Sequence, residues 1–309
     1  MSKKNKNRML NLITKNKRLF GNILTSPVTI ILFPIVILLG INRKSAEFVR
    51  NIYYAYRIRV IQKQIKKYEI HSNNNLPGNN TVWVYWDVGL DNAPDIVKIC
   101  AERLQNIDEE KIIFLNSENI NEYITMPAEY QTALDLGYIP KAHYSDLLRT
   151  ELLYKHGGIW LDATVYLSNN TIPDELKSDE FFVYCMSLPA LNCNPIYLSS
   201  WAIASPPRSP ILGLTREYLK NYWKKKSKLN DYFLFHMVLC AILNEFPNLR
   251  PSTLGFYDNS KPHLLQLRFS DRYDEKIFQK IMEQTSIHKL TYKYENVIDG
   301  SMLSHILKL

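Results

Sequence analysis

The sequence predicts an α/β fold with a mixed, mainly parallel sheet, preceded by a hydrophobic and basic helical segment for membrane association. Three observations lead to this prediction. Strand, helix and strand patterns alternate between residues 81 and 116, an order that is typical of parallel sheets. A helix, a Gly-Gly pair and a further strand pattern follow at 144–167. Residues 1–70 combine a long apolar run with many basic residues, and a turn-rich stretch at 71–80 separates them from the rest.

The most hydrophobic stretch, residues 23–41, has basic residues on both sides. Its uninterrupted part, 28–41, contains Pro34 and is shorter than the about 20 apolar residues of a spanning helix. Because both flanks are basic, the pattern favours a segment that anchors or re-enters at the cytoplasmic face of the membrane. A cleaved signal peptide would need a cleavage site of small residues, and none follows. A single span and a buried core helix are the alternatives.

Residues 48–70 mix tyrosines with arginines and lysines, a composition typical of helices that lie on an anionic membrane surface. A solvated helix that packs on the folded domain is the alternative. The sequence thus predicts a membrane-association region at 1–75 and a folded domain at 80–309. Residues 1–70 hold 15 Lys and Arg against two acidic residues, whereas the remainder holds 23 against 28. The folded domain is therefore not basic, and we expect no nucleic-acid partner.

The domain begins with four elements. Residues 81–87 and 111–116 have the composition of strands, and residues 93–105 and 127–138 have the periodicity of helices. In parallel sheets of this kind, ligands bind beyond the carboxyl ends of the strands. Trp86 lies at the end of the first strand, so it is a candidate for ligand contact, with a plain core position as the alternative.

The centre of the chain predicts a helix, a turn and a strand. Residues 144–156 carry leucines at helical spacing, with Ser145 as the expected N-cap. Gly157-Gly158 should end this helix, because glycine readily adopts the backbone conformation of a helix end. Residues 159–167 are then expected to form one strand.

Three polar residues interrupt this apolar stretch. Asp146 and Arg149 are three apart, so they share a helix face. Asp162 lies within a hydrophobic strand, where an unpaired carboxylate would be costly. A metal, another cation or a hydrogen-bonding ligand would remove that cost. The alternative is a structural Asp146–Arg149 pair, with Asp162 facing water at a strand end.

The motif S-D-L-L-R-x-x-x-L-x-x-x-G-G-x-W-L-D-A-T, residues 145–164, resembles the core signature of DXD-type glycosyltransferases. It is similar in particular to the capsular polysaccharide synthesis proteins, which are related to glycosyltransferase family 32. Residues 82–103 resemble the first strand and helix of this family. The resemblance implies a GT-A-like nucleotide-sugar-binding domain. It also implies that Asp146 and Arg149 contact the donor sugar, and that Asp162 binds a Mg²⁺ or Mn²⁺ ion that holds the nucleotide diphosphate.

One residue departs from the family pattern. Thr164 stands where the second Asp of D-x-D is usual, although the D-A-T form also occurs in the capsule subgroup. A hydroxyl is a weaker, neutral ligand for a hard cation. We therefore expect the metal to depend on Asp162, the donor phosphates, water and a further ligand, with Thr164 among the donor contacts.

The later part of the chain is less informative. The stretch around Trp201 is irregular, and the resemblance places acceptor or donor contacts near it. Residues 231–246 predict an apolar helix, in which Asp231 and His236 are candidates for late contributions to the site. A structural role is the alternative for His236. Residues 286–293 carry no motif with an assignable role.

Other reaction classes lose support from absent motifs. The chain has no G-x-G-x-x-G, G-x-x-x-x-G-K-[ST], H-E-x-x-H or G-x-S-x-G sequence, and its four cysteines form no C-x-x-C pair. The resemblance implies a retaining, hexosyltransferase-type enzyme that uses a nucleotide-sugar donor, with a UDP-sugar favoured. Its acceptor would be a lipid-linked oligosaccharide in capsular or exopolysaccharide synthesis. The alternatives are a non-catalytic membrane-associated sugar-binding or assembly protein, favoured by Thr164, and a phosphate-transferring enzyme.

Overall fold

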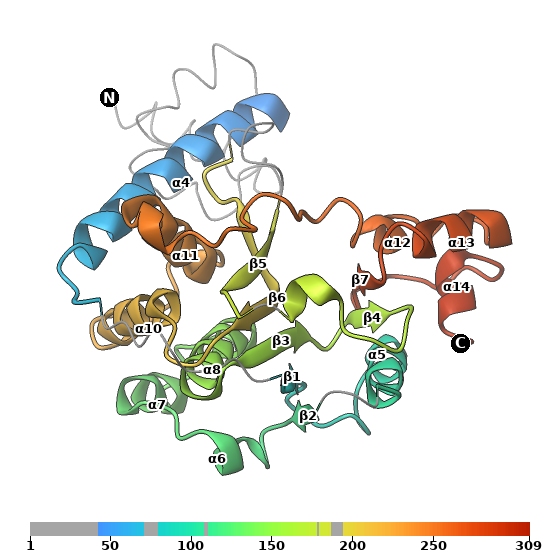
Figure 1. The fold of residues 1–309 in the computed structure, drawn as a ribbon, viewed down its shortest axis with the longest axis horizontal. Helices are drawn as coiled ribbons and strands as arrows, with labels where there is room; N and C mark the ends of the chain where they lie inside the picture. The colour runs from blue at the N-terminus through green and yellow to red at the C-terminus, as the bar shows by residue number, and fades with distance from the viewer. Residues whose placement is uncertain (1–42, 71–79, 108–110, 178, 187–193) are drawn as a thin grey trace, which may run out of the picture.

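The computed structural model describes residues 43–70, 80–107, 111–177, 179–186 and 194–309 (Figure 1). Its strands are β1 (Val82–Tyr85), β2 (Ile112–Leu115), β3 (Gly158–Asp162), β4 (Val165–Leu167), β5 (Phe182–Cys185), β6 (Leu198–Ser205) and β7 (Ile287–Lys289). Its α-helices are α4 (Arg43–Ile65), α5 (Asp95–Gln105), α6 (Ile120–Tyr123), α7 (Ala128–Asp135), α8 (Lys141–His156), α10 (Pro210–Trp223), α11 (Leu234–Glu245), α12 (Leu264–Leu267), α13 (Glu275–Met282) and α14 (Met302–Ile306). Short 3₁₀ turns lie at Asp174–Leu176 and Pro247–Leu249.

The central sheet has the strand order β2-β1-β3-β6-β5. β1 pairs in parallel with both β2 and β3, whereas β6 is antiparallel to both β3 and β5. Four of these five strands therefore point the same way, and the prediction of a mixed, mainly parallel sheet is confirmed. The register sets Tyr85 opposite both Leu115 and Asp162, so β1, β2 and β3 end at one edge.

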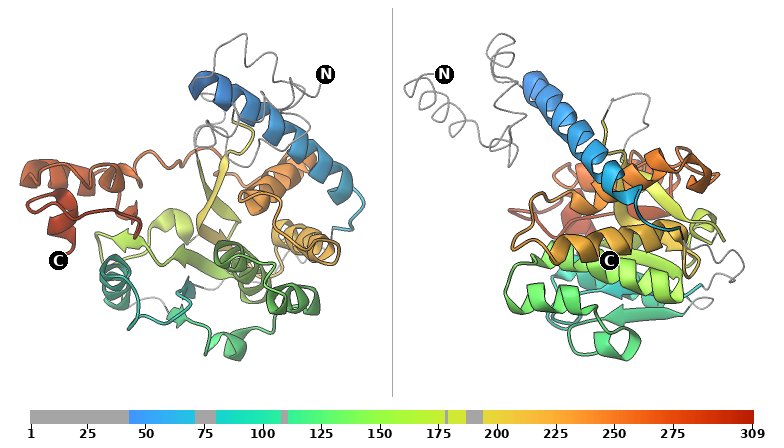
Figure 2. Two further views of the ribbon diagram at one scale, coloured as in Figure 1. Left: turned by 180° about the vertical axis from the view of Figure 1, so that it is seen from behind. Right: turned by 90° about the vertical axis from the view of Figure 1, so that its left-hand side faces the viewer.

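Helices cover both faces of this sheet (Figures 1 and 2). Side chains alternate along a strand, so neighbours such as Trp83 and Val84 enter different hydrophobic clusters. The Trp83 cluster includes buried residues of α8, α10 and α11. The Val84 cluster includes α5, the helices α12 to α14 and the small β4–β7 sheet. The sheet is therefore the middle of three layers.

The strand expected at 159–167 is two strands, which corrects the sequence prediction. β3 stops at Asp162, the chain turns at Ala163 and Thr164, and β4 leaves the central sheet to pair with β7. Both halves are apolar and buried, so their composition alone could not reveal the break. The turn brings Asp162 to the end of a strand instead of its interior.

Helix α4 packs on the folded domain. The sequence favoured a position on the membrane surface for residues 48–70, with this packing as the alternative. One face of it is buried against the cluster that contains α11 and α10. The buried residues are Val49, Tyr53, Tyr54, Ile58, Ile61 and Ile65. Tyr53 and Tyr54 are therefore not free to enter lipid, because they fill the core. The expected boundary at 71–80 does not separate two hydrophobic cores among the described residues.

Within the described ranges, no helix combines the length and the apolar character that crossing a membrane requires. The predicted anchor at 23–41 lies outside those ranges.

Candidate active site

A cavity of about 800 Å³ opens at the edge where β1, β2 and β3 end. Trp86 and Ser117 line it just beyond β1 and β2, and Asp162 lines it at the end of β3. Its walls also include parts of α8 and the segment 289–293. This volume lies within the range of about 300–1,000 Å³ that is usual for small-molecule sites. The cavity occupies the edge where an α/β sheet is expected to bind its ligand.

Helix α8 begins earlier than predicted. It starts at Lys141 behind Pro140, whose fixed φ of −65° suits a helix entry, so Ser145 is inside the helix and not its N-cap. The Oγ of Ser145 lies 3.5 Å from the backbone oxygen of Lys141. The predicted end is confirmed at Gly157, which has φ +70°. A Cβ at Gly157 would lie 2.7 Å from Pro207 Cδ, so the turn into β3 requires glycine.

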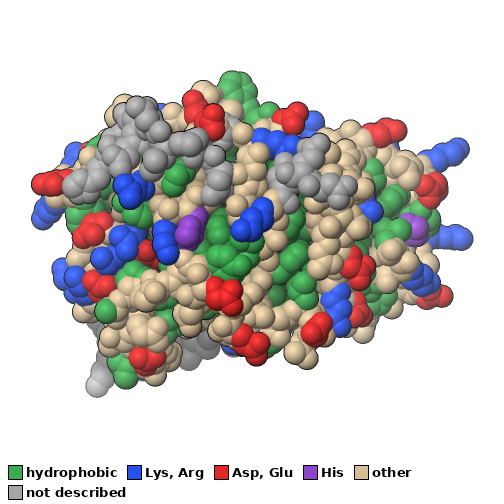
Figure 3. All heavy atoms as spheres, turned by 60° about the horizontal axis from the view of Figure 1, so that its bottom comes forward, with side chains coloured by type: hydrophobic (Ala, Val, Ile, Leu, Met, Phe, Trp, Pro, Cys, Tyr) green, Lys and Arg blue, Asp and Glu red, His purple; other side chains and the backbone are tan. Residues whose placement is uncertain are grey.

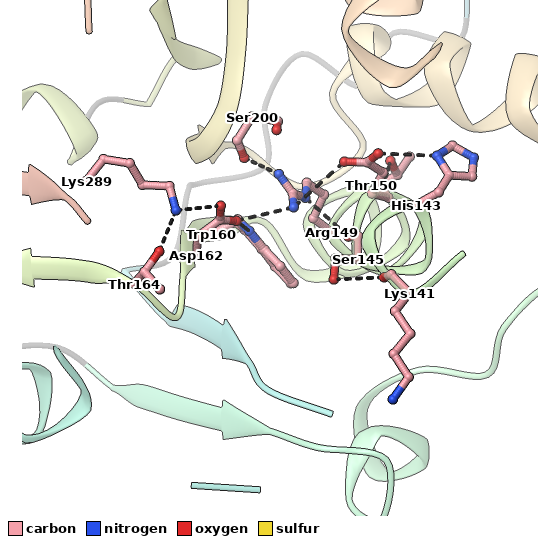
Figure 4. Close-up of polar contacts among 11 residues, drawn as sticks. Lys141, His143, Ser145, Arg149, Thr150, Trp160, Asp162, Thr164, Ser200 and Lys289 are labelled. Carbon is pink, nitrogen blue, oxygen red and sulfur yellow. Dashed lines mark hydrogen bonds and ion pairs between the residues drawn. The ribbon is translucent and has the colours of Figure 1, made fainter. Parts of the chain in front are cut away.

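Arg149 joins the predicted carboxylates on the cavity wall (Figure 4). Its Nη2 lies 3.3 Å from Asp162 Oδ1 and 3.7 Å from Asp146 Oδ1. Its Nε donates to the backbone oxygen of Ser145, and Nη1 donates to that of Ser200. Only 5% of the side chain is exposed. The guanidinium is therefore fixed between α8, β3 and β6, with all three predicted residues brought together.

Both carboxylate oxygens of Asp162 have partners. Oδ1 accepts a hydrogen bond from Trp160 Nε1 at 3.1 Å as well as from Arg149. Oδ2 lies 3.3 Å from Lys289 Nζ, which also donates to Thr164 Oγ1. Burial disfavours the charged form of Asp162, but Lys289 and Arg149 outweigh it, and the pKa falls below its ordinary value. Asp162 is thus an ionised, doubly paired carboxylate at the cavity wall.

The segment 289–293 was not predicted to belong to the site. Lys289 is the last residue of β7 and lies opposite Val165 of β4, so strand pairing carries it to Asp162. Tyr292 and Lys293 line the same wall. The strand is only three residues long, Ile-His-Lys, and nothing local to it indicates a partner far away in the chain.

Asp146 has a second partner that the sequence analysis missed. Its Oδ2 lies 3.2 Å from His143 Nδ1, and the indole of Trp223 donates to His143 Nε2 at 3.3 Å. Since Nε2 accepts from the indole, this network assigns the ring proton to Nδ1, which then donates to Asp146. His143 therefore orients the Asp146 carboxylate from inside the protein.

Trp86 is on the cavity wall as expected. Its ring meets Tyr292 edge to face, with 5.1 Å between the ring centroids. Its buried Nε1 has no hydrogen-bond partner among the described residues, so a ligand acceptor would satisfy it. The neighbouring Asp87 accepts from Tyr85 at 2.9 Å and pairs with Lys141 at 2.7 Å. A ring system and several polar groups thus lie together at the end of β1.

His236 reaches the cavity from α11 and is buried. Burial lowers its pKa to about 4, so the imidazole is neutral at pH 7. Its Nδ1 has no partner among the described residues. A neutral ring with an open nitrogen can donate to or accept from a ligand hydroxyl.

Two other candidates do not line the cavity. Trp201 stacks on Tyr184 with 4.6 Å between ring centroids and donates to Asn259. Asp231 accepts a hydrogen bond from the backbone of Phe233 at 2.8 Å, at the start of α11. Their positions favour structural roles, in the core and at a helix end.

The side chains around Asp162 do not form a ready site for Mg²⁺ or Mn²⁺. No group of three His, Cys, Asp or Glu residues suited to a metal occurs in the described part of the chain. The oxygens of Asp162 and Thr164 that would ligate an ion are both bonded to Lys289. An ion there would have to displace an ammonium or lie beside it. Metal binding remains a prediction.

The family model described as capsular polysaccharide synthesis protein matches residues 35–306. A solved structure titled PaToxG Glycosyltransferase is 14% identical and covers 76% of this chain and 94% of its own, with a TM-score of 0.38. A likeness this remote says nothing about the reaction. Among curated proteins, no match to the chain was found. From the match to the family model, the chain belongs to the capsular polysaccharide synthesis protein family.

Proposed function

We propose that this protein is a glycosyltransferase that moves a sugar from a nucleotide-diphosphate donor, with a UDP-sugar favoured, to a lipid-linked saccharide in capsule or exopolysaccharide synthesis. One observation carries the proposal. Asp146, Arg149 and Asp162 converge on one wall of a cavity that also exposes Trp86. Carboxylates and a guanidinium suit sugar hydroxyls and phosphates, and an aromatic ring suits a nucleobase. The GT-A-like assignment rests on the same arrangement at the end of a mainly parallel sheet.

The side chains divide the work in this proposal. Asp146, oriented by His143, and Arg149 hold the donor sugar. Trp86 and Tyr292 provide the aromatic surface for the base. In the transfer, the bond between the anomeric carbon and the phosphate oxygen breaks and its electron pair leaves with the nucleoside diphosphate. The acceptor hydroxyl oxygen bonds to the anomeric carbon, and its proton passes to the departing phosphate oxygen.

A donor screen tests the proposal. Purified full-length protein is incubated with UDP-, GDP-, CDP- and ADP-sugars, with and without a polyprenyl-linked acceptor, and nucleoside diphosphate release is measured. Release from one donor should fall at least about 100-fold in Asp146→Asn, since a transition-state contact is worth several kcal/mol. Asp299→Asn is the matched control, because Asp299 is 97% exposed and is not among the residues that line the cavity. Equal loss in both variants, or no release from any donor with acceptor present, would contradict the proposal.

We propose retention of the anomeric configuration, as the family resemblance implies. The NMR coupling constant of the new glycosidic bond in the product decides this directly. A product whose anomeric configuration is opposite to that of the donor would refute it.

We also propose that the protein works on an anionic membrane at the cytoplasmic face, near a lipid-linked acceptor. A cavity of about 520 Å³ lies between α4 and α10, and its lining includes Arg57, Lys67, Lys225 and Lys226. None of its described lining residues is acidic. The face in Figure 3 carries acidic and basic side chains side by side. The cavity is therefore suited to phosphate headgroups.

Vesicle sedimentation tests this role. The double variant of Lys225→Gln and Lys226→Gln should bind vesicles rich in phosphatidylserine more weakly, with unchanged binding to neutral vesicles. The matched control replaces Lys276 and Lys280 on α13 with glutamine, which removes the same charge from another exposed site. Identical behaviour of the two double variants would contradict the proposal.

A non-catalytic sugar-binding or assembly protein is the second candidate. Thr164 and the pairing of Lys289 with Asp162 favour it, because both depart from an acidic metal site. Donor binding without release of nucleoside diphosphate, even with the acceptor, would establish that function.

A further inference from the structure

We propose that the ammonium of Lys289 takes the place of the divalent metal at this site and binds the donor diphosphate, so that donor binding needs no metal. This inference rests on the proposed function. It rests on the contacts of the Lys289 side chain, which reaches both Asp162 and Thr164 of the D-A-T sequence.

Lys289 bridges the two residues that would otherwise ligate an ion. Its Nζ lies 3.3 Å from Asp162 Oδ2 and donates to Thr164 Oγ1 (Figure 4). An ammonium has three hydrogens, and two are directed at these oxygens. The third has no bond to the described residues. The side chain is 18% exposed and lines the cavity, so this hydrogen is available to a bound phosphate oxygen.

The single negative charge of Asp162 already has two cationic partners without an added ion. Arg149 lies 3.3 Å from Oδ1, and Lys289 lies 3.3 Å from Oδ2. A divalent cation on Asp162 would be placed beside two fixed positive charges, in a partly buried region where solvent screens them incompletely. Thr164 could offer it only a neutral hydroxyl. Threonine accepts from an ammonium as readily as it ligates an ion, which gives the D-A-T sequence a physical reason.

The position of Lys289 is fixed by the backbone. β7 pairs with β4, and Lys289 lies opposite Val165. On either side of that pairing, the amide of Leu290 donates to the backbone oxygen of Thr164 at 2.9 Å, and the amide of Lys289 donates to that of Pro262 at 2.8 Å. The backbone of Lys289 is therefore fixed before the ligand arrives, and Asp162 and Thr164 hold its ammonium, which lowers the entropic cost of binding.

A second lysine extends the positive wall. Lys293 lines the cavity four residues later, with Nζ 5.6 Å from the ring centroid of Tyr292. Together with Arg149 and Lys289 it provides three cations on the cavity wall. Asp146 and Asp162 already pair with Arg149 and Lys289, so Lys293 supplies the positive charge in excess, and all three cations can donate hydrogen bonds to a diphosphate.

Calorimetric titration of the full-length protein with UDP, and in parallel GDP, CDP and ADP, tests the proposal. Each titration is done once in excess EDTA and once in Mn²⁺. We expect the wild type to bind its nucleotide within about threefold the same affinity in both. Lys289→Met, which keeps the aliphatic stem, should bind about 10- to 100-fold more weakly in EDTA, because it loses a charge-assisted hydrogen bond. Lys289→Arg should retain more affinity, and exposed Lys276→Met should match the wild type.

Binding of the wild type that disappears in EDTA and returns with Mn²⁺ overturns the role of Lys289 and leaves the proposed function intact. Binding of no nucleotide in either condition overturns the proposed function and this inference with it. The EDTA comparison uses the unmodified protein, so it holds even if Lys289→Met unfolds, which circular dichroism would reveal. A folded Lys289→Met that binds like the wild type in EDTA also refutes the inference.

Discussion

Replacing Ile61 with alanine should destabilise the whole protein, because α4 is part of its core. Ile61 is 1% exposed and lies in the cluster shared with α10 and α11. The change removes three buried carbon groups, worth roughly 2.4 kcal/mol at about 0.8 kcal/mol each. The cavity left behind raises the total to about 3 kcal/mol. At about 2 °C for each kcal/mol in a chain of this size, the melting temperature should fall by about 6 °C.

The control for Ile61→Ala lies on the same helix. Tyr56 is 54% exposed, so Tyr56→Ala should change the free energy of unfolding by less than about 0.5 kcal/mol. Differential scanning fluorimetry of the two variants in detergent-matched buffer makes the comparison. If α4 lay on a membrane instead, Ile61→Ala would leave the melting temperature unchanged and weaken vesicle binding. That result would refute the packing described above.

Three further predictions concern stability. Gly157→Ala should lower the free energy of unfolding by more than about 2 kcal/mol, because the added Cβ would clash with Pro207. Gly137→Ala, also at positive φ but in open space, should cost only about 1 kcal/mol in the same melting assay. Burial lowers the pKa of His288 from 6.5 to about 4, so the unfolded chain binds the extra proton. Stability should therefore fall by up to about 3 kcal/mol as the pH falls from about 6.5 to 4, and His288→Phe should flatten that part of a urea-unfolding pH series. Arg216→Met should lower the free energy of unfolding in urea by about 2–3 kcal/mol, because it leaves Glu151 buried without its cation. A variant as stable as the wild type would contradict this prediction.

The local elements could be predicted from the sequence because their signals are local. The leucine spacing gives the body of α8, and Gly157 gives its end. Strand β6 was missed because its start is rich in serine, and its strand character comes from pairing with β3 and β5. The break after Asp162 was missed because β3 and β4 are equally apolar and buried, although they join different sheets.

The site could be predicted only in part, for the same reason. Helix spacing places Asp146 and Arg149 on one face, and the resemblance to the family motif implied that Asp162 joins them. Lys289 reaches them only through the pairing of β4 with β7. His143 gave no signal, since its role depends on Trp223 from a different helix.

The pairing of β4 with β7 also bears on biosynthesis. Thr164 and its partner Lys289 are 125 residues apart, which a ribosome adding 5–20 residues per second covers in roughly 6–25 s. When Lys289 is added, it is still inside the exit tunnel, so the contact forms only after translation has passed this position. The Asp162 carboxylate therefore waits without this partner while these residues are added. The cavity wall formed by residues 289–293 is therefore completed late in relation to α8 and β3.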